Sequence, residues 1–251
     1  MKIPVAVQLY SIREEAASDL LGCIAKVAEM GYSCVEFAGY HGQSASDIRN
    51  ALDAAGITAP STHLALKFLD DESFSETIEF HQTVGIKDLV IPWLPSEMHD
   101  SPASTLETSK MLSDLTAKVR EHGFRLGFHA HGQDMVVLEG GKSSYQILGE
   151  NTPSDFVMQY DTANGMSAGA DPVEPILMFP GRNYSTHLKE WSGEHGAKVI
   201  GEGLVPWNEV FAACEGEGGT QWYIVEHESY EGMTPMESIA RCLNNIRSMG
   251  R

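Results

Sequence analysis

The fold is decided at the first apolar segment, which reads Pro4-Val5-Ala6-Val7-Gln8-Leu9-Tyr10-Ser11-Ile12-Arg13. A short apolar run of this kind is typical of a buried strand. A nucleotide-binding open sheet would place a Gly-x-Gly-x-x-Gly phosphate turn directly after it, and this segment has none. The segment therefore favours a closed barrel, with a doubly wound open sheet as the alternative.

Seven further strand-like segments follow along the chain. They cover residues 34–40, 57–66, 86–93, 124–131, 155–161, 184–189 and 222–227. Apolar residues at helical spacing lie between them, for example Leu20, Ile24, Val27, Leu106, Leu112, Leu115, Val119, Ile239, Leu243 and Ile246. Eight alternating strand and helix units in 251 residues predict one (β/α)8 TIM barrel, with residues 1–251 forming a single domain.

The turn residues agree with this alternation. Gly31, Gly56, Gly85 and Gly123 each follow a helical pattern and precede a strand, where glycine ends a helix in the left-handed conformation. Two segments predict helix starts with proline at the first helical position, Thr234-Pro235-Met236-Glu237 and Asp171-Pro172-Val173-Glu174.

Composition excludes several classes of function. The chain has 17 Lys and Arg against 35 Asp and Glu, and its formal net charge of −18 would repel nucleic acid at long range. No apolar run reaches membrane-spanning length, and the N-terminus shows no signal segment, so we expect a cytoplasmic protein without a membrane partner. The four cysteines form no Cys-x-x-Cys pair and are expected to be reduced and mostly buried.

Polar or ionisable residues stand near the end of almost every predicted strand. They are Gln8, Glu36, His63, His129 with His131, Asp161, His187 and Glu226. Burying so many polar groups costs stability, which implies that they meet at one site. Active sites of barrels lie at the carboxyl ends of the strands, so the pattern predicts an enzyme.

Four of the candidate residues suit a divalent cation. Asp134, Asp161, His187 and Glu226 come from four successive units and offer one imidazole and three carboxylates, a mixture that binds Mn²⁺, Mg²⁺, Co²⁺ or Zn²⁺. Taken singly, His187 could be a hydrogen-bonded structural histidine and Asp161 a turn or cap residue. His129 and His131 face the same side of a strand, and one of them could instead satisfy a backbone carbonyl.

Several segments together resemble one known family. They are Val7-Gln8-Leu9-Tyr10-Ser11-Ile12-Arg13, Val35-Glu36-Phe37-Ala38-Gly39-Tyr40, Gly127-Phe128-His129-Ala130-His131, Asp161-Thr162-Ala163-Asn164, His187-Leu188-Lys189-Glu190, Gly201-Glu202-Gly203 and Tyr223-Ile224-Val225-Glu226. Their order and spacing resemble the xylose isomerase-like TIM-barrel superfamily. Within it, the chain is most similar to the sugar phosphate isomerase/epimerase group, with inosose dehydratase and the ketose 3-epimerases as relatives.

The resemblance implies one metal ion held by Asp134, Asp161, His187 and Glu226. The first position departs from the family, because relatives commonly carry His-Asn-His-Asp-Phe-Glu where this chain has His129-Ala130-His131-Gly132-Gln133-Asp134. In the epimerases the missing glutamate is both a ligand and a proton-transfer base. An aspartate reaches one methylene less far, which puts symmetrical two-carboxylate proton exchange in doubt.

The activity implied is that of a metal-dependent isomerase or epimerase in carbohydrate metabolism, acting on an unphosphorylated keto-sugar or polyol ketone through an enediolate. Catalytic candidates are Glu226 as base, with Asp134 and His131.

Substrate-binding candidates are Gln8, Glu36, His63, His129, Lys189 and Glu202. Glu36 and Lys189 could instead form a structural pair with each other. Glu202, a carboxylate where many barrels bind phosphate, argues against a phosphorylated substrate.

Two other classes of function are open. The alternative is a lyase of the inosose dehydratase or 3-keto-glycoside type, and a third is a non-catalytic or endonuclease IV-like barrel. Of the aromatic residues, Trp93 is best placed for a platform under a sugar ring, although buried packing is the commoner role. The expected partner is a small-molecule sugar, and the resemblance implies a homodimer.

Overall fold

Eight parallel strands close into one barrel in the computed structural model, which describes residues 2–193, 198–230 and 232–251. The strands are β1 (Val5–Gln8), β2 (Cys34–Phe37), β3 (Thr58–His63), β4 (Asp88–Ile91), β5 (Arg125–His129), β6 (Val157–Asp161), β7 (Ser185–Leu188) and β8 (Trp222–Val225). Each pairs with the next along the chain, and β1 also pairs with β8, so the sheet closes on itself. The predicted barrel is confirmed, and the open-sheet alternative is wrong.

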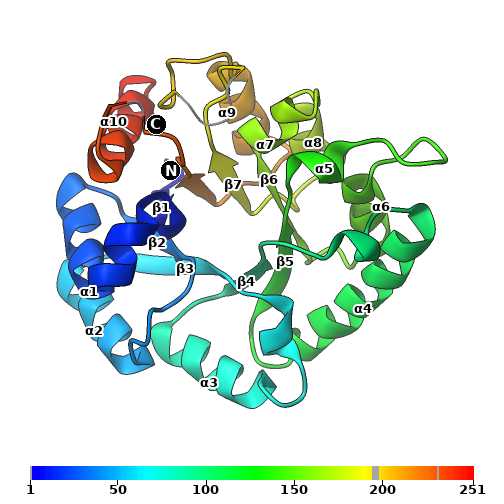
Figure 1. Ribbon diagram of the computed structural model, residues 1–251, viewed down its shortest axis with the longest axis horizontal. Coiled ribbons are helices and arrows are strands. Elements are labelled where there is room, and N and C mark those ends of the chain that lie inside the picture. The colour runs from blue at the N-terminus through cyan, green and yellow to red at the C-terminus, as the bar shows by residue number, and fades with distance from the viewer. Residues whose placement is uncertain (1, 194–197, 231) are drawn as a thin grey trace.

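The helices form an outer ring around the barrel (Figure 1). They are α1 (Arg13–Met30), α2 (Ala45–Ala55), α3 (Phe74–Val84), α4 (Pro102–Arg120), α5 (Gly132–Met135), α6 (Ser144–Asn151), α7 (Thr162–Ser167), α8 (Glu174–Met178), α9 (Trp207–Glu215) and α10 (Pro235–Ser248), with 3₁₀ turns η1 (Leu9–Ile12), η2 (Leu66–Leu69) and η3 (Ser96–Met98). The predicted apolar faces of α1 and α10 are buried. Leu106 also lies in a helix, α4, as its spacing predicts, but it is 48% exposed.

Helix ends follow the turn residues identified in the sequence. Gly31, Gly56 and Gly85 end α1, α2 and α3 with φ of 97°, 68° and 90°. Thr234 forms the predicted capping box at the start of α10. At α8 the helix begins only at Glu174, but the Asp171 carboxylate accepts the Val173 and Glu174 N–H groups at 2.8 and 3.0 Å.

The polar strand-end residues lie at one mouth of the barrel. Gln8, His63, His129 and Asp161 are each the last residue of their strand, because the strands end earlier than the apolar runs predict. At the opposite end, Asp88 of β4 pairs with Arg125 of β5, with Nε to Oδ1 at 2.6 Å.

All four cysteines are free and buried, as predicted. In the described part of the chain, no helix combines the length and the apolar character needed to cross a bilayer.

Candidate metal centre and active site

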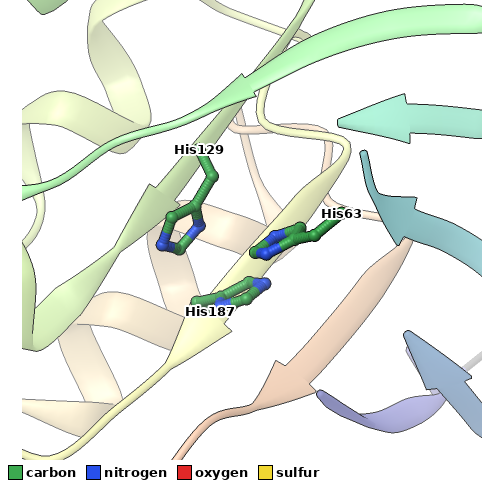
Figure 2. A group of neighbouring side chains, drawn as sticks. All are labelled: His63, His129 and His187. Carbon is green, nitrogen blue, oxygen red and sulfur yellow. The ribbon is translucent and has the colours of Figure 1, made fainter. Parts of the chain in front are cut away.

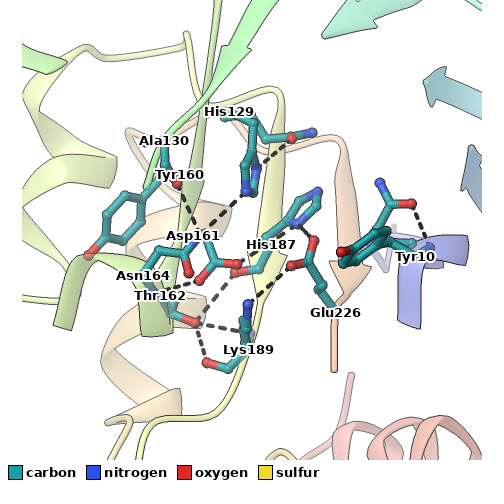
Figure 3. Close-up of polar contacts among 12 residues, drawn as sticks. Tyr10, His129, Ala130, Tyr160, Asp161, Thr162, Asn164, His187, Lys189 and Glu226 are labelled. Atoms are coloured by element: carbon teal, nitrogen blue, oxygen red, sulfur yellow. Dashed lines mark hydrogen bonds and ion pairs between the residues drawn. The ribbon is translucent and has the colours of Figure 1, made fainter. Parts of the chain in front are cut away.

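Four side chains from the second half of the barrel form a buried cluster at the mouth (Figure 3). His129 ends β5, Asp161 ends β6, His187 lies in β7, and Glu226 directly follows β8. One nitrogen or oxygen atom from each lies within 4.8 Å of one from every other member. Two imidazoles and two carboxylates at this spacing form a donor set for one divalent cation.

Asp161 carries an oxygen that the protein leaves without a hydrogen bond. Its Oδ1 accepts the Asn164 N–H at 2.8 Å and so starts α7, whereas the buried Oδ2 has no hydrogen-bond partner and lies 4.0 Å from His187 Nδ1. Burial raises the pKa of Asp161 to about 6, with Lys189 opposing the shift and Glu226 adding to it. A buried carboxylate oxygen without a partner is costly, and a cation would satisfy it. The residues therefore fit a metal ion.

His187 lies between two carboxylates. Its Nε2 is 2.7 Å from Glu36 Oε1, and its Nδ1 is 2.8 Å from Glu226 Oε2. Burial lowers the pKa of His187, but these two carboxylates outweigh it and raise the pKa to about 10. Because Nδ1 faces Asp161 and Glu226, it is the nitrogen that a cation would take, while Glu36 orients the ring through Nε2.

Glu36 is a fully buried carboxylate surrounded by donors. It accepts hydrogen bonds from Gln8 Nε2 at 2.7 Å, Ser61 Oγ at 2.5 Å and Gln159 Nε2 at 2.9 Å, besides its contact with His187. Burial raises its pKa, but His63, His187 and the hydrogen bonds bring the pKa down to about 2. The predicted substrate-binding residues Gln8 and Glu36 thus lie beneath the cluster and are not among the residues that line the mouth cavity.

Gln159 joins two of the histidines. Its Oε1 lies 2.9 Å from both His129 Nδ1 and His63 Nε2, and since an amide oxygen only accepts, both imidazoles donate to it. The lone pair of His129 is therefore on Nε2, which accepts a long hydrogen bond from Asn164 Nδ2 at 3.4 Å. Burial together with the charge of His187 lowers the pKa of His129 well below the ordinary value. Figure 2 shows the rings of His63, His129 and His187 gathered at the mouth, and those of His63 and His187 stack with centroids 5.3 Å apart.

The predicted ligand Asp134 lies outside the cluster. Residues 132–135 form the short helix α5, which turns the carboxylate back toward its own segment. Asp134 Oδ2 accepts the His131 N–H at 2.8 Å, and Oδ1 lies 2.8 Å from His99 Nδ1 and 3.3 Å from Ser144 Oγ. The structure thus differs from the sequence-based ligand set, with His129 as the fourth member of the cluster in place of Asp134.

Lys189 and Glu226 form a buried ion pair. Lys189 Nζ donates to Glu226 Oε1 at 3.1 Å and also to Glu228, and the sequence-based alternative of a Glu36 pair does not form. Burial raises the pKa of Glu226, but Lys189 and His187 outweigh it and hold the pKa well below the ordinary value. Glu226 is consequently a carboxylate at neutral pH.

A cavity of about 460 Å³ opens above the cluster. His63, His129, His131, Glu226 and Glu228 line its polar side. Burial lowers the pKa of His131.

Of the other predicted substrate contacts, Lys189 is buried behind this lining. Glu202 is not part of the lining, and it pairs with Arg241 at 2.5 Å.

Sequence reasoning missed Gln159 and Glu228. Gln159 is two residues before Asp161 on β6, so both side chains face the same side of the strand. This two-residue spacing could have identified Gln159 from the sequence. Glu228 follows β8 in a loop, where no periodic pattern marks it.

A (β/α)8 barrel with histidines and carboxylates gathered at the carboxyl ends of its strands has the architecture of a barrel enzyme. The chain belongs to the xylose isomerase-like TIM barrel family, whose model matches residues 24–248. This confirms the resemblance drawn from the sequence. Members of the family include isomerases, epimerases and a dehydratase.

Individual relatives are distant. Inosose dehydratase of Geobacillus kaustophilus (strain HTA426) is 23% identical over 188 residues, which cover 66% of this chain and 60% of that relative. A solved sugar phosphate isomerase/epimerase from Parabacteroides distasonis ATCC 8503 has a TM-score of 0.82 at 20% identity, covering 99% of this chain and 95% of that one. The IolI protein, solved with a zinc atom, has a TM-score of 0.75 at 14% identity, covering 98% and 97% of the two chains.

Proposed function

We propose that the protein is a divalent-metal-dependent isomerase or epimerase of an unphosphorylated keto-sugar or a related polyol ketone. The observation that carries this proposal is the buried Asp161 oxygen without a hydrogen bond, facing His187 and Glu226. A cation held by His129, Asp161, His187 and Glu226 would supply positive charge that stabilises an enediolate. Two imidazole nitrogens in the donor set favour Zn²⁺, Co²⁺ or Mn²⁺ over Mg²⁺.

Glu226 is the base in this proposal. It lines the cavity, and the charge of Lys189 keeps it ionised, so it can remove the proton next to the substrate carbonyl. His131 lines the same cavity, where its N–H can donate a hydrogen bond to a substrate hydroxyl group, and its imidazolium form can return a proton.

An unphosphorylated substrate is supported by the charges around the cavity. Among its described lining residues, none is Lys or Arg. The buried cation nearby, Lys189, is already paired with Glu226 and Glu228. A phosphate group inside the cavity would therefore meet the carboxylates of Glu226 and Glu228 without a Lys or Arg in the lining to bind it.

A lyase is the second candidate, and the position of Asp134 favours it. Epimerisation needs bases on both faces of the substrate, but Asp134 is held by His99 and Ser144 away from the cluster. Glu226 then remains as the base, with His131 as the acid, and one base with one acid is enough to eliminate water or a glycosyl group from a keto-sugar. The similarity to inosose dehydratase supports the same reading.

Solvent deuterium uptake tests the proposal. The chain is incubated in D₂O with Mn²⁺ and a panel of ketoses and inososes, and deuterium at the carbon next to the carbonyl is measured by mass spectrometry and NMR. We expect exchange that stops when a chelator is added. Glu226→Gln should lower the exchange rate about a hundredfold or more. Glu150→Gln is the matched control, because Glu150 pairs with Lys142 on the outer surface and should exchange normally.

The products separate the two candidates. Epimer or isomer formation supports the first, whereas an unsaturated ketone absorbing in the ultraviolet supports the lyase. Absence of exchange with every ketone in the panel would contradict both.

A further inference from the structure

The exposed aromatic side chains of the protein gather at one place. In the described part of the chain, the exposed Phe, Tyr and Trp residues are Tyr10, Phe68 and Trp93, with 44%, 43% and 56% of their surface accessible. All three line the mouth cavity, although they come from η1, η2 and the loop after β4. Aromatic surface left open at a concave site marks a ligand contact more often than a packing defect. We call these three residues the aromatic rim.

Phe68 and Trp93 of the rim follow β3 and β4, across the barrel from β7 and β8. Tyr10 follows β1, which pairs with β8, and lies beside Glu226 (Figure 3). Ala38, Ala65 and Pro92 fill the wall between the rim residues. Their side chains offer no hydrogen-bonding group, so the hydroxyls of a second sugar would lose water there without gaining partners. A flat apolar ring has no hydrogen bonds to water to lose in the same place, and it gains stacking contacts with the aromatic rim.

A second cavity extends this apolar side. It has a volume of about 300 Å³ and shares Gly39, His63, Ala65 and Phe68 with the first. Tyr40, Leu64 and Phe80 contribute further apolar lining, and Ser73, Glu76, Thr77 and His81 contribute polar groups at its far end. The space around Phe68 therefore continues beyond the mouth, which leaves room for a substituent attached to the reacting sugar.

Two rim residues are held in place by cations. The Lys67 Nζ lies 5.1 Å from the centroid of the Phe68 ring, and the Arg13 guanidinium carbon lies 4.8 Å from that of Tyr10. Such contacts limit ring motion, which lowers the entropic cost of stacking a ligand on them.

We infer that the substrate is a keto-sugar that carries an aryl group, with the sugar at the polar cluster and the aryl ring on the aromatic rim. This inference rests on the proposed function for the identity of the reacting end. It goes further by making Phe68 and Trp93 specificity-determining residues, which bind the part of the substrate that does not react.

Binding of three stable probes tests the inference. Phenyl β-D-glucopyranoside, methyl β-D-glucopyranoside and cellobiose are titrated into the full chain with Mn²⁺ by isothermal calorimetry, so no turnover is needed. We expect the phenyl glucoside to bind about tenfold more tightly than either of the others. Trp93→Ala and Phe68→Ala should each reduce that preference about three- to tenfold and leave the methyl glucoside affinity nearly unchanged.

Leu106→Ala is the matched control, since Leu106 is similarly exposed but lies on the outer helix α4. It should keep the full preference for the phenyl glucoside. Equal binding of phenyl and methyl glucosides, tighter binding of cellobiose, a preference that survives both rim substitutions, or no binding of any probe at millimolar concentration would each overturn the inference.

The two experiments distinguish an error in the inferred aryl group from an error in the proposed reaction. Deuterium exchange without a phenyl preference would remove the aryl group and keep the enediolate chemistry. A preference for the phenyl glucoside that depends on Trp93, without deuterium exchange for any ketone, would support aryl binding at the aromatic rim and contradict the proposed reaction.

Discussion

The two halves of the barrel mouth are built from different chemistry. Strands β5 to β8 contribute His129, Asp161, His187 and Glu226, all buried and close enough to share one ion. The loops after β1 to β4 contribute an apolar wall and the aromatic rim. One cavity can therefore keep its charges at low dielectric on one side and recognise an apolar group on the other.

Glu36 is the main exception to this division, beside its contacts Gln8 of β1 and His63 of β3. It comes from β2, in the apolar half, yet its carboxylate reaches His187 across the barrel.

Asp161→Asn should have the largest effect. The amide oxygen can still accept the Asn164 N–H and cap α7, but the charge on the unpartnered oxygen is lost. Because loss of an orienting partner alone costs up to about a hundredfold in metal affinity, loss of this ligand should cost at least about a hundredfold, measured by calorimetric titration with Mn²⁺. Asp171→Asn, which alters the cap next to α8, is the control and should bind Mn²⁺ normally. Equal affinities in both variants would contradict the proposed centre.

Glu36→Gln should be the next largest change and tests the exception. It leaves His187 with one buried carboxylate fewer, and removing one partner of a buried pair costs about 3–5 kcal/mol of unfolding free energy. The comparison is Asp88→Asn at the other end of the barrel, where Arg125 is 32% exposed and water can replace the lost partner, so about 1–2 kcal/mol is expected. Urea unfolding of the metal-free proteins measures both. Equal losses would show that Glu36 has no special role.

Asp134→Asn tests where the charged half ends. Since Asp134 contacts His99, His131 and Ser144, its substitution should cost about 1–2 kcal/mol of stability. The Mn²⁺ affinity should stay within about twofold of the original protein. If the affinity instead falls as far as in Asp161→Asn, the ligand set predicted from the sequence is the correct one.

Substitution of His81, a residue of α3 in the apolar half, should have the smallest effect on stability. Its Nδ1 lies 2.6 Å from the Thr77 carbonyl oxygen, and burial lowers its pKa below the ordinary 6.5. The unfolded chain therefore binds a proton at His81 near pH 6.5, whereas the folded chain binds it only at a lower pH. The free energy of unfolding consequently falls as the pH drops from 6.5 through the folded-state pKa. The slope is at most about 1.4 kcal/mol per pH unit.

His81→Gln removes this contribution. Urea unfolding between about pH 7.5 and about pH 5.5 should show a smaller acid loss in the variant than in the original protein. Parallel losses would mean that His81 does not titrate in this range.

The barrel could be predicted from the sequence because its signals are local. Apolar runs, helical spacing and the glycines Gly31, Gly56 and Gly85 each depend on neighbouring residues only. The lengths of the strands could not be predicted in this way. Residues such as Ala38 and Trp93 continue an apolar run beyond the end of their strand, where they line the cavity.

The site was predictable where strand position alone decides it. Asp161, His187 and Glu226 meet because the carboxyl ends of parallel strands meet. Asp134 does not join them, because the short helix α5 turns one carboxylate oxygen back to the His131 N–H and because His99, from the preceding unit of the barrel, contacts the other. The exposure of Trp93 likewise follows from the closed barrel and has no sign in its neighbours.

The first turn of α7 shares a side chain with the cluster. Asp161 Oδ1 accepts the Asn164 N–H at 2.8 Å, and the other oxygen of the same carboxylate faces His187. The two oxygens share one delocalised charge, so a cation at one withdraws electron density from the hydrogen bond at the other. The backbone amide of Asn164 is thus a natural spectroscopic probe. Its ¹⁵N and ¹H chemical shifts should report the occupancy of the centre without any label on the metal.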